Sequence, residues 1–283
     1  MSPALFAVHI SDGVLTPAWL AGGFLVAILL LIPSVLRVRD DEIPRIGMLS
    51  AAAFVGSQIH IPLGVSSVHL LLNGLIGVLL GKRAVLAITI GLVLQAMLFG
   101  HGGKLSLGVN ICILAIPAML AGVSFPPLLR MFAAIPPILR IGIAALAISI
   151  WLAAIVTTAQ IIVWKLKEWN PRDWLDDASL MWVASVPVVM VIVLASAIAA
   201  WGVMRKQRGH AFAAGLILGG ACGMLTVLGN ALAVHFGGID GVRVAAPVTF
   251  LANLPVVAAE ALGVAAVVSY LSKVKPEWLS SSE

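Results

Sequence analysis

Successive apolar runs, separated by short charged loops, constrain this chain more than any other feature. A helix needs about 20 consecutive apolar residues to cross the hydrocarbon core of a bilayer. The 283 residues have a mean hydropathy of +1.11 and contain nine candidate spans. The sequence therefore predicts an all-α polytopic protein of the cell (inner or plasma) membrane, with residues 1–283 forming one integral membrane domain of about nine helices. The candidate spans are 17–36, 44–59, 64–81, 84–100, 106–124, 138–164, 180–203, 211–235 and 246–271.

The placement of charge predicts the orientation of these spans. If nine helices alternate in direction, twelve of the 17 Lys and Arg residues fall on one side of the membrane. Cytoplasmic loops are the loops enriched in basic residues, so we expect the N-terminus outside and the C-terminus in the cytoplasm. Because the basic residues lie between apolar runs, the net charge of +5 does not indicate a nucleic-acid partner.

Five of the six histidines then fall at or near the outer ends of spans. Membrane interfaces tolerate histidine, but the distribution also suits an outward-facing cation site. Imidazole nitrogen suits cobalt, nickel, copper and zinc ions better than magnesium or calcium. These histidines are His9, His60, His69, His101 and His235.

Enzyme signatures are missing from the sequence. It contains neither the H-E-x-x-H motif of zinc proteases nor the G-x-S-x-G nucleophile elbow. The run from Gly77 to Arg83 has the wrong spacing for a phosphate loop and lacks Ser or Thr after its lysine. We therefore expect no enzyme activity, and any uphill transport must draw its energy from another protein.

Polar residues recur inside the apolar runs. Ser66, His69, Asn73 and Gly77 follow one another at three- and four-residue steps, which predicts one polar face on a third helix. Such a stripe at membrane depth can line a ligand path or form a hydrogen-bond ladder between helices. Glu260 is the one acid deep inside a predicted span, where it needs a partner or a proton.

A second polar region surrounds a pair of glycines. Gly102 and Gly103 follow His101 in a predicted outer loop, and Gln95 and Asn110 flank this loop inside the apolar runs. Two consecutive glycines allow the backbone to fold back toward a site, although they also suit a simple tight turn.

Four ordered motifs resemble the CbiM/NikM family, the substrate-capture components of energy-coupling-factor transporters for cobalt and nickel. Family members typically begin Met-His-Ile-x-(Asp/Glu)-Gly, which is similar to His9 through Leu15. The resemblance covers a metal-capture core at 8–123 and a last helix with its cytoplasmic end at 246–279, whereas 124–245 match poorly. It implies a core of about seven helices, to which two spans are added. The other three motifs are Pro62–His69, Gln95–Asn110, and Leu254–Glu260 with Lys273–Glu277.

The resemblance implies a metal bound by the N-terminal amine, by the amide nitrogen and ring of the adjacent histidine, and by a second histidine. His9 and His69 match these two histidines. Glu260 would serve helix packing or coupling to partners. The alternative donors are Val8, His60 and His101, and the residues expected to fix the ligands or their loops are Asp12, Gln95 and Asn110.

One departure from the family pattern concerns the amine. Eight residues precede His9, whereas the family's histidine is the second residue of its chain. Two hypotheses restore the site: Val8 is the initiating residue, encoded by GUG and read as Met, or cleavage after Ala7 exposes Val8.

The resemblance implies the substrate-binding membrane component of an ABC importer of the energy-coupling-factor type for Co(II) or Ni(II), with no permanently bound cofactor. Its implied partners are a transmembrane coupling protein, cytoplasmic ATPases and a small accessory membrane subunit, besides membrane lipid. The alternative is a non-transporting structural or regulatory membrane protein whose metal site has decayed and whose polar stripes serve only helix packing.

Overall fold

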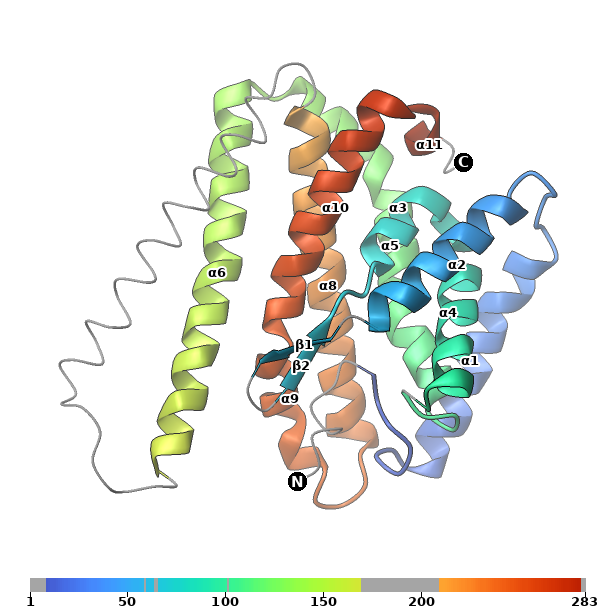
Figure 1. Cartoon of the computed structure of the whole chain (residues 1–283), viewed down its shortest axis with the longest axis vertical. Helices are drawn as coiled ribbons and strands as arrows, with labels where there is room; N and C mark the ends of the chain where they lie inside the picture. The colour runs from blue at the N-terminus through green and yellow to red at the C-terminus, as the bar shows by residue number, and fades with distance from the viewer. Residues whose placement is uncertain (1–8, 59, 64–65, 101, 169–208, 281–283) are drawn as a thin grey trace.

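The computed structural model describes residues 9–58, 60–63, 66–100, 102–168 and 209–280, which form a helical bundle with one small β-hairpin (Figure 1). Within a bilayer no water bonds to the backbone, so each apolar segment satisfies its own N–H and C=O groups as a helix. The helices are α1 (Pro17–Val35), α2 (Ile43–Gln58), α3 (Asn73–Leu80), α4 (Ala84–Leu98), α5 (Leu107–Ala134), α6 (Pro137–Glu168), α8 (Gly209–Gly237), α9 (Ala246–Ala252), α10 (Leu254–Val274) and α11 (Glu277–Ser280), and the strands are β1 (His60–Leu63) and β2 (Ser66–His69).

Five helical segments are long and apolar enough to cross a membrane. Large apolar side chains lie exposed on the outside of the bundle, as Leu25 and Leu29 of α1 do at 60% and 61%. Such a surface suits lipid rather than water. The part of the chain described here is therefore built as a multi-pass membrane protein. The five segments are Pro17–Val35, Asn73–Leu98, Leu107–Ala134, Gly209–Gly237 and Thr249–Val274, of which the second and fifth are each built from two successive helices.

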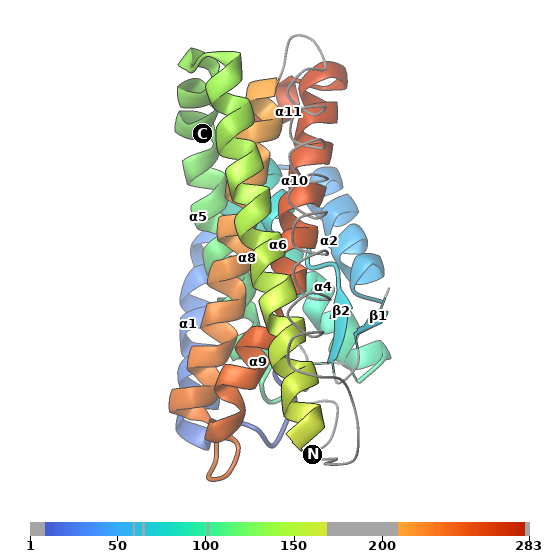
Figure 2. The same ribbon diagram turned by 90° about the vertical axis from the view of Figure 1, so that its left-hand side faces the viewer.

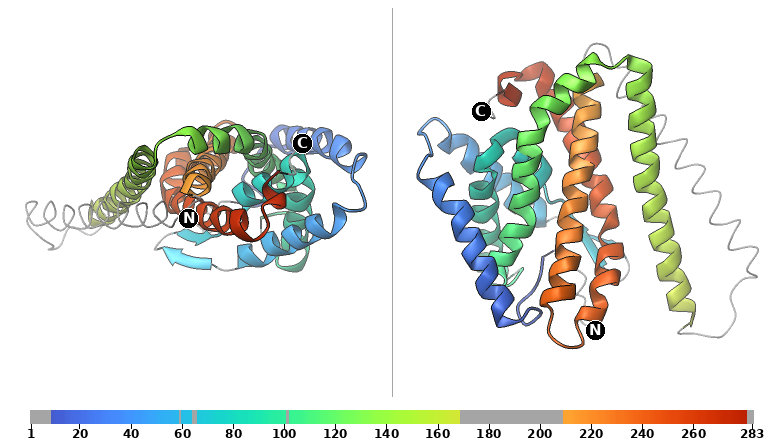
Figure 3. Two further views of the ribbon diagram at one scale, coloured as in Figure 1. Left: turned by 90° about the horizontal axis from the view of Figure 1, so that it is seen from above. Right: turned by 180° about the vertical axis from the view of Figure 1, so that it is seen from behind.

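Helices α8 and α10 pack closely over most of their length, and α5 packs on another side of α8 (Figures 2 and 3). Glycines on α8 make the close approach possible. A Cβ atom on Gly215 would lie 2.9 Å from the Cα atom of Ala265, and one on Gly219 would lie 2.8 Å from the carbonyl oxygen of Glu260. Small residues serve in this way where helices associate in lipid.

Helices α3 and α4 form a tight hairpin. Gly81 ends α3 with a φ of 54°, and the 3₁₀ turn Gly81–Arg83 leads directly into α4. Asn73 at the start of α3 donates a hydrogen bond to the carbonyl oxygen of Leu114, and Leu114 also lines a cavity with Gln95 near the end of α4. The chain therefore reverses between α3 and α4, so the start of α3 and the end of α4 both lie beside Leu114 of α5.

The predicted span 64–81 is wrong as a single helix. Ser66–His69 form strand β2, which pairs antiparallel with β1, and α3 begins only at Asn73. Between them Leu72 adopts a left-handed conformation with a φ of 56°, which no α-helix accommodates. The expected helical face through Ser66, His69, Asn73 and Gly77 therefore does not exist, and the regular structure among the described residues is helical apart from the β1–β2 hairpin.

The other predicted spans compare with the structure in different ways. The segment predicted at 44–59 is helical as α2, but its 16 residues are not among the helices long enough to cross a membrane. The span 138–164 corresponds to α6, and 180–203 lies outside the described residues. The count of nine spans and the orientation of the termini stay predictions. The predicted spans 17–36, 106–124, 211–235 and 246–271 correspond to helical segments long enough to cross a membrane, at α1, α5, α8 and α9–α10, and 84–100 corresponds to the 15-residue helix α4.

The bundle has two distinct ends (Figure 1). The segment that begins at His9 lies at the end where α1, α5 and α10 start, and we call this the His9 end. Helix α11 lies at the opposite end, where Arg45 of α2 donates a hydrogen bond to the carbonyl oxygen of Trp278 and stacks over its ring at 5.0 Å. We call this the α11 end.

Candidate functional site

Residues 9–16, here called the N-terminal segment, fold back against the His9 end of the bundle. Their backbone pairs with the end of α8 and the loop after it: the N–H of Thr16 donates to the carbonyl of Gly237 at 2.8 Å, and the N–H of Ile239 donates to the carbonyl of Val14 at 3.0 Å. Ile10, Val14 and Leu15 are buried among apolar residues of α5 and α8. The segment is therefore fixed to two helices rather than lying on the surface.

Asn110 of α5 holds the residue next to His9. Its side-chain oxygen accepts a hydrogen bond from the N–H of Ile10 at 2.9 Å, and its Nδ2 donates to the carbonyl oxygens of Ile10 at 2.9 Å and Gly102 at 2.7 Å. The hydroxyl of Ser106 lies 2.5 Å from the same carbonyl of Ile10. Asn110 is 1% exposed, so its amide satisfies backbone groups that water does not reach.

Asp12 anchors the N-terminal segment a second time. Its carboxylate accepts hydrogen bonds from the N–H groups of Lys104, Leu105 and Ser106, at 2.8, 2.8 and 3.0 Å. These residues directly precede α5, where free backbone N–H groups favour an anion. Burial raises the pKa of the Asp12 carboxyl, but these hydrogen bonds outweigh it and hold the pKa below its ordinary value of 3.8. Asp12 is therefore a carboxylate at neutral pH.

The two loop glycines make room for this contact. Gly102 and Gly103 have φ values of 86° and 67°, which side chains rarely adopt. A Cβ atom on Gly103 would lie 2.3 Å from a carboxylate oxygen of Asp12, and one on Gly102 would lie 3.3 Å from the Cβ atom of His9. The glycine pair therefore lets the loop fold back against the N-terminal segment.

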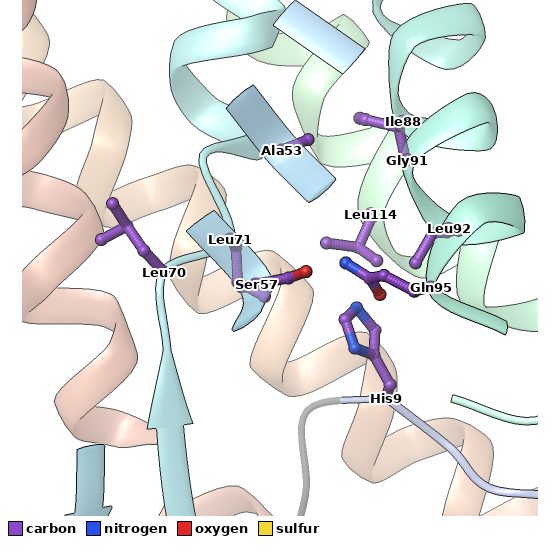
Figure 4. Close-up of a pocket in the computed structure, with 10 residues that line it drawn as sticks. All are labelled: His9, Ala53, Ser57, Leu70, Leu71, Ile88, Gly91, Leu92, Gln95 and Leu114. Atoms are coloured by element: carbon purple, nitrogen blue, oxygen red, sulfur yellow. The ribbon is translucent and has the colours of Figure 1, made fainter. Parts of the chain in front are cut away.

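The imidazole of His9 points into a small cavity (Figure 4). The cavity has a volume of about 20 Å³, which is roughly the space of one water molecule or one ion. His9 itself is 3% exposed. The side chains of Gln95 from α4 and Ser57 from α2 point toward the same space (Figure 4). The remaining lining residues are Ala53, Leu70, Leu71, Ile88, Gly91, Leu92 and Leu114.

Gln95 contributes a carbonyl oxygen to this cavity. The residue is 3% exposed, and its Oε1 atom has no hydrogen-bond partner within the described residues. A buried polar atom of this kind is rare unless a water molecule or an ion satisfies it. The cavity therefore combines an imidazole with at least one unsatisfied oxygen.

The second predicted histidine belongs to the strand that leads into this cavity. His69 ends β2 and pairs with His60 in the antiparallel register, and Leu70 and Leu71 line the cavity directly after it. His9 thus lines the cavity directly, and the backbone of His69 lies one residue before Leu70, which also lines it. The side chains of His60 and His69 lie outside the described part of the structure.

Glu260 of α10 fixes the residues that follow His69. The carboxylate oxygen Oε1 accepts hydrogen bonds from the N–H groups of Leu71 and Leu72, at 2.7 and 2.6 Å. Glu260 therefore finds its partner in the backbone beside the cavity rather than in another charged side chain.

The structure thus assembles several of the predicted residues at one end of the bundle. His9 and Gln95 line the cavity, while Asp12, Asn110 and Glu260 hold the backbone on its two sides. Val8 and His101 lie outside the described residues. Within the described ranges, no three His, Cys, Asp or Glu side chains gather closely enough to hold a metal ion.

Sequence reasoning missed two polar residues of this region. Ser106 bonds the backbone of the N-terminal segment, and its position just before an apolar run, typical of a residue that starts a helix, could have indicated it. Ser57 lines the cavity, but a serine near the end of an amphipathic helix carries no signal that separates it from ordinary surface serines.

An apolar helical bundle that encloses an ion-sized cavity, with a histidine segment fixed at one end, defines a multi-pass membrane protein with a buried polar site. Comparison with known families identifies it further. The chain belongs to the CbiM family, described as the cobalt uptake substrate-specific transmembrane region, whose model matches residues 9–193 and 188–278.

Two curated relatives are named for metal transport. The chain is 40% identical over 144 residues to a protein of Haemophilus influenzae named for metal transport, covering 50% of this chain and 69% of the relative. It is 31% identical over 118 residues to a protein of Archaeoglobus fulgidus named as a fused nickel transport protein NikMN, covering 41% of this chain and 40% of the relative. The similarity thus spans less than half of that longer relative.

A solved structure shares the fold. A crystal structure of a transition metal transporter superposes with a TM-score of 0.52 and 22% sequence identity, covering 94% of this chain and 93% of the other. At this identity the likeness supports the architecture of the bundle alone.

Proposed function

We propose that this protein is the substrate-capture component of an importer for Co(II) or Ni(II), and that it binds the ion in the cavity beside His9. One observation carries the proposal: His9 is buried against a cavity of about 20 Å³ that Leu70 and Leu71, the residues directly after His69, also line. A cavity of this size suits a single desolvated ion, and imidazole ligands suit both metals.

His9 and His69 are the proposed nitrogen ligands. An amine at Val8, or the imidazole of His60 or His101, would supply a further nitrogen. The oxygens of Gln95 and Ser57 face the same cavity and are available to the ion or to a ligating imidazole. Nitrogen-rich tetragonal sites favour Ni(II) or Cu(II) over harder ions.

The anchoring of the N-terminal segment supports capture rather than loose binding. Asp12, Ser106 and Asn110 hold the backbone on the C-terminal side of His9 through at least six hydrogen bonds. A ligand held in place before the metal arrives loses little conformational freedom on binding. The ion would then exchange its water for fixed donors in a dry cavity.

Energy for import is proposed to come from separate subunits. Cytoplasmic ATPases and a transmembrane coupling protein would drive release of the ion, and a small accessory membrane subunit would complete the transporter. The chain has no phosphate loop of its own, and the name of the Archaeoglobus relative describes a fusion of transport proteins. The proposed assembly fits both observations.

Substitution of the two histidines tests the proposal. We expect His9→Ala and His69→Ala, singly, to weaken binding of Co(II) and Ni(II) to the purified protein by roughly tenfold or more, because each removes a ligand. Isothermal titration with each metal in detergent provides the measurement. His235→Ala is the matched control, since His235 lies at the same end of the bundle but does not line the cavity, and its ring contacts Phe236 edge to face with the centroids 4.7 Å apart. Wild-type affinity in the His9→Ala/His69→Ala double variant would show that neither histidine is a ligand, whereas a wild-type protein that binds neither metal would leave the non-transporting alternative.

A further inference from the structure

The side chain of Glu260 contacts the candidate site only through hydrogen bonds to the backbone of Leu71 and Leu72. It lies on α10 and is 1% exposed, and its Oε1 atom accepts from the N–H groups of both Leu71 and Leu72. Its other oxygen, Oε2, has no hydrogen-bond partner within the described residues. The carboxylate therefore acts on one short stretch of chain, Leu71 and Leu72, the last two of the three residues between strand β2 and helix α3.

This stretch adopts a backbone conformation that needs external support. Leu72 has a φ of 56° and a ψ of 5°, and it is the only non-glycine residue with a positive φ in the described part of the chain. Such a conformation persists only where the surroundings impose it. The Glu260 carboxylate bonds both N–H groups at this turn, so it supplies such a constraint.

The turn also determines where His69 can lie. Leu71 lines the cavity, and His69 precedes it by two residues in the strand that pairs with β1. Helix α3 begins directly after Leu72 and is held independently, because Asn73 donates to the hydroxyl of Thr226 at 2.8 Å and to the carbonyl of Leu114 at 3.3 Å. With α3 fixed, the angle at Leu71 and Leu72 sets the approach of β2 to the cavity.

We propose that Glu260 is a positioning residue for His69, which holds the strand of this ligand at the cavity through the geometry of one carboxylate oxygen rather than through its charge. The inference rests on the proposed function, because it assigns His69 as a ligand. It differs from a packing role, which would stabilise α10 against α8 without affecting the metal, and from an electrostatic role, which would require the negative charge itself.

Two variants of Glu260 separate these roles. Glu260→Gln keeps the side-chain length and an accepting oxygen but removes the charge. Glu260→Asp keeps the charge but is one methylene shorter, so the hydrogen bonds of 2.7 and 2.6 Å cannot both form. Val264→Ala is the matched control, because it removes a buried apolar side chain of α10 that packs at Gly219 of α8 and leaves the Glu260 contact intact.

The experiment measures the Kd for Co(II) and Ni(II) and the metal-free Tm of the full chain in detergent. We expect Glu260→Asp to weaken binding by roughly tenfold to a hundredfold, whereas Glu260→Gln and Val264→Ala stay within about threefold even if the Tm falls. Wild-type affinity in Glu260→Asp overturns the inference. A loss of affinity in Glu260→Gln alone overturns it in favour of charge, and a loss in Val264→Ala equal to that in Glu260→Asp overturns it in favour of packing.

Amide hydrogen exchange at Leu71 and Leu72 in Glu260→Gln decides the question if Glu260→Asp does not fold. Slow exchange with retained affinity, or fast exchange with lost affinity, supports the inference. Fast exchange with retained affinity overturns it, as does slow exchange with lost affinity. A wild-type protein that binds neither metal would instead contradict the proposed function, so the two failures are distinguishable.

Discussion

The N-terminal segment and the turn after His69 are anchored by the same chemistry in opposite surroundings. In each, a carboxylate accepts hydrogen bonds from consecutive backbone N–H groups. Asp12 is carried by the histidine segment itself and lies exposed, and it reaches out to the start of α5. Glu260 belongs to helix α10 and is buried, and its carboxylate bonds the backbone of the turn after His69.

The difference teaches where each anchor is vulnerable. Water can replace an exposed carboxylate at the N–H groups it leaves behind, whereas a buried N–H left without a partner costs about 1–3 kcal/mol. The N-terminal segment compensates for its exposed carboxylate with Asn110, a buried amide that bonds Ile10 from both sides. The N-terminal segment therefore depends on the buried side chain of Asn110, and the turn after His69 depends on that of Glu260.

Asn110→Leu should give the largest effect on the N-terminal side of this comparison. It leaves the N–H of Ile10 without its buried partner and removes one of the two side chains, the other being Ser106, that bond the carbonyls of Ile10 and Gly102. We expect metal affinity to fall by roughly tenfold to a hundredfold, measured as Kd by titration calorimetry of the folded variant.

Arg83→Gln is the control for this variant. Arg83 bonds Glu42 and the carbonyl of Ser34 at the α11 end of the bundle, so its loss should reduce stability without changing the Kd. An Asn110→Leu protein with wild-type affinity would show that the N-terminal segment is held well enough by its apolar contacts.

Asp12→Ala should give a smaller effect, since Lys104 and Leu105 are exposed and solvent reaches their N–H groups once the carboxylate is gone. We expect a weakening of metal binding of roughly threefold to tenfold, because hydrated amides recover part of the lost bonding. The same titration measures it. A loss larger than that of Asn110→Leu would reverse the ranking of exposed and buried anchors.

Acidification should give the smallest effect over the ordinary range. The pKa of Asp12 is held below its ordinary value of 3.8, so the stabilisation from this contact is complete above that value and is lost as the pH falls through the lowered pKa. Hydrogen exchange at Leu105 and Ser106, corrected for the intrinsic rate, should therefore be constant from pH 7 to about pH 4.5. Increased exchange at pH 6 would assign control of this contact to another group.

Long apolar runs made much of the fold predictable from the sequence. Helices α5 and α8 contain the predicted spans 106–124 and 211–235, because a lipid environment requires apolar residues over the full length of a helix. The region 64–81 was mispredicted because its polar residues happened to recur at helical spacing, while the β-hairpin and the left-handed Leu72 depend on contacts formed elsewhere.

The sequence allowed several residues of the candidate site to be predicted, but not the contacts that these residues make. Asp12, Asn110 and Glu260 stand out as polar residues near or within apolar runs, yet Asp12 bonds residues 92 to 94 positions away and Glu260 bonds residues 188 and 189 positions away. Nothing in local spacing encodes such partners. The roles of these side chains in fixing backbone follow only from the folded chain.

The close fit between Gly103 and Asp12 has a consequence for reading genetic data on this protein. Any side chain at position 103 would collide with the carboxylate, at 2.3 Å from its oxygen, in a backbone conformation with a φ of 67°. A mutational scan selected for metal uptake should therefore record position 103 as intolerant as a ligand, although glycine has no side chain with which to bind an ion. Intolerance to substitution at position 103 would therefore report the close fit of this loop against Asp12, and not metal binding by the residue itself.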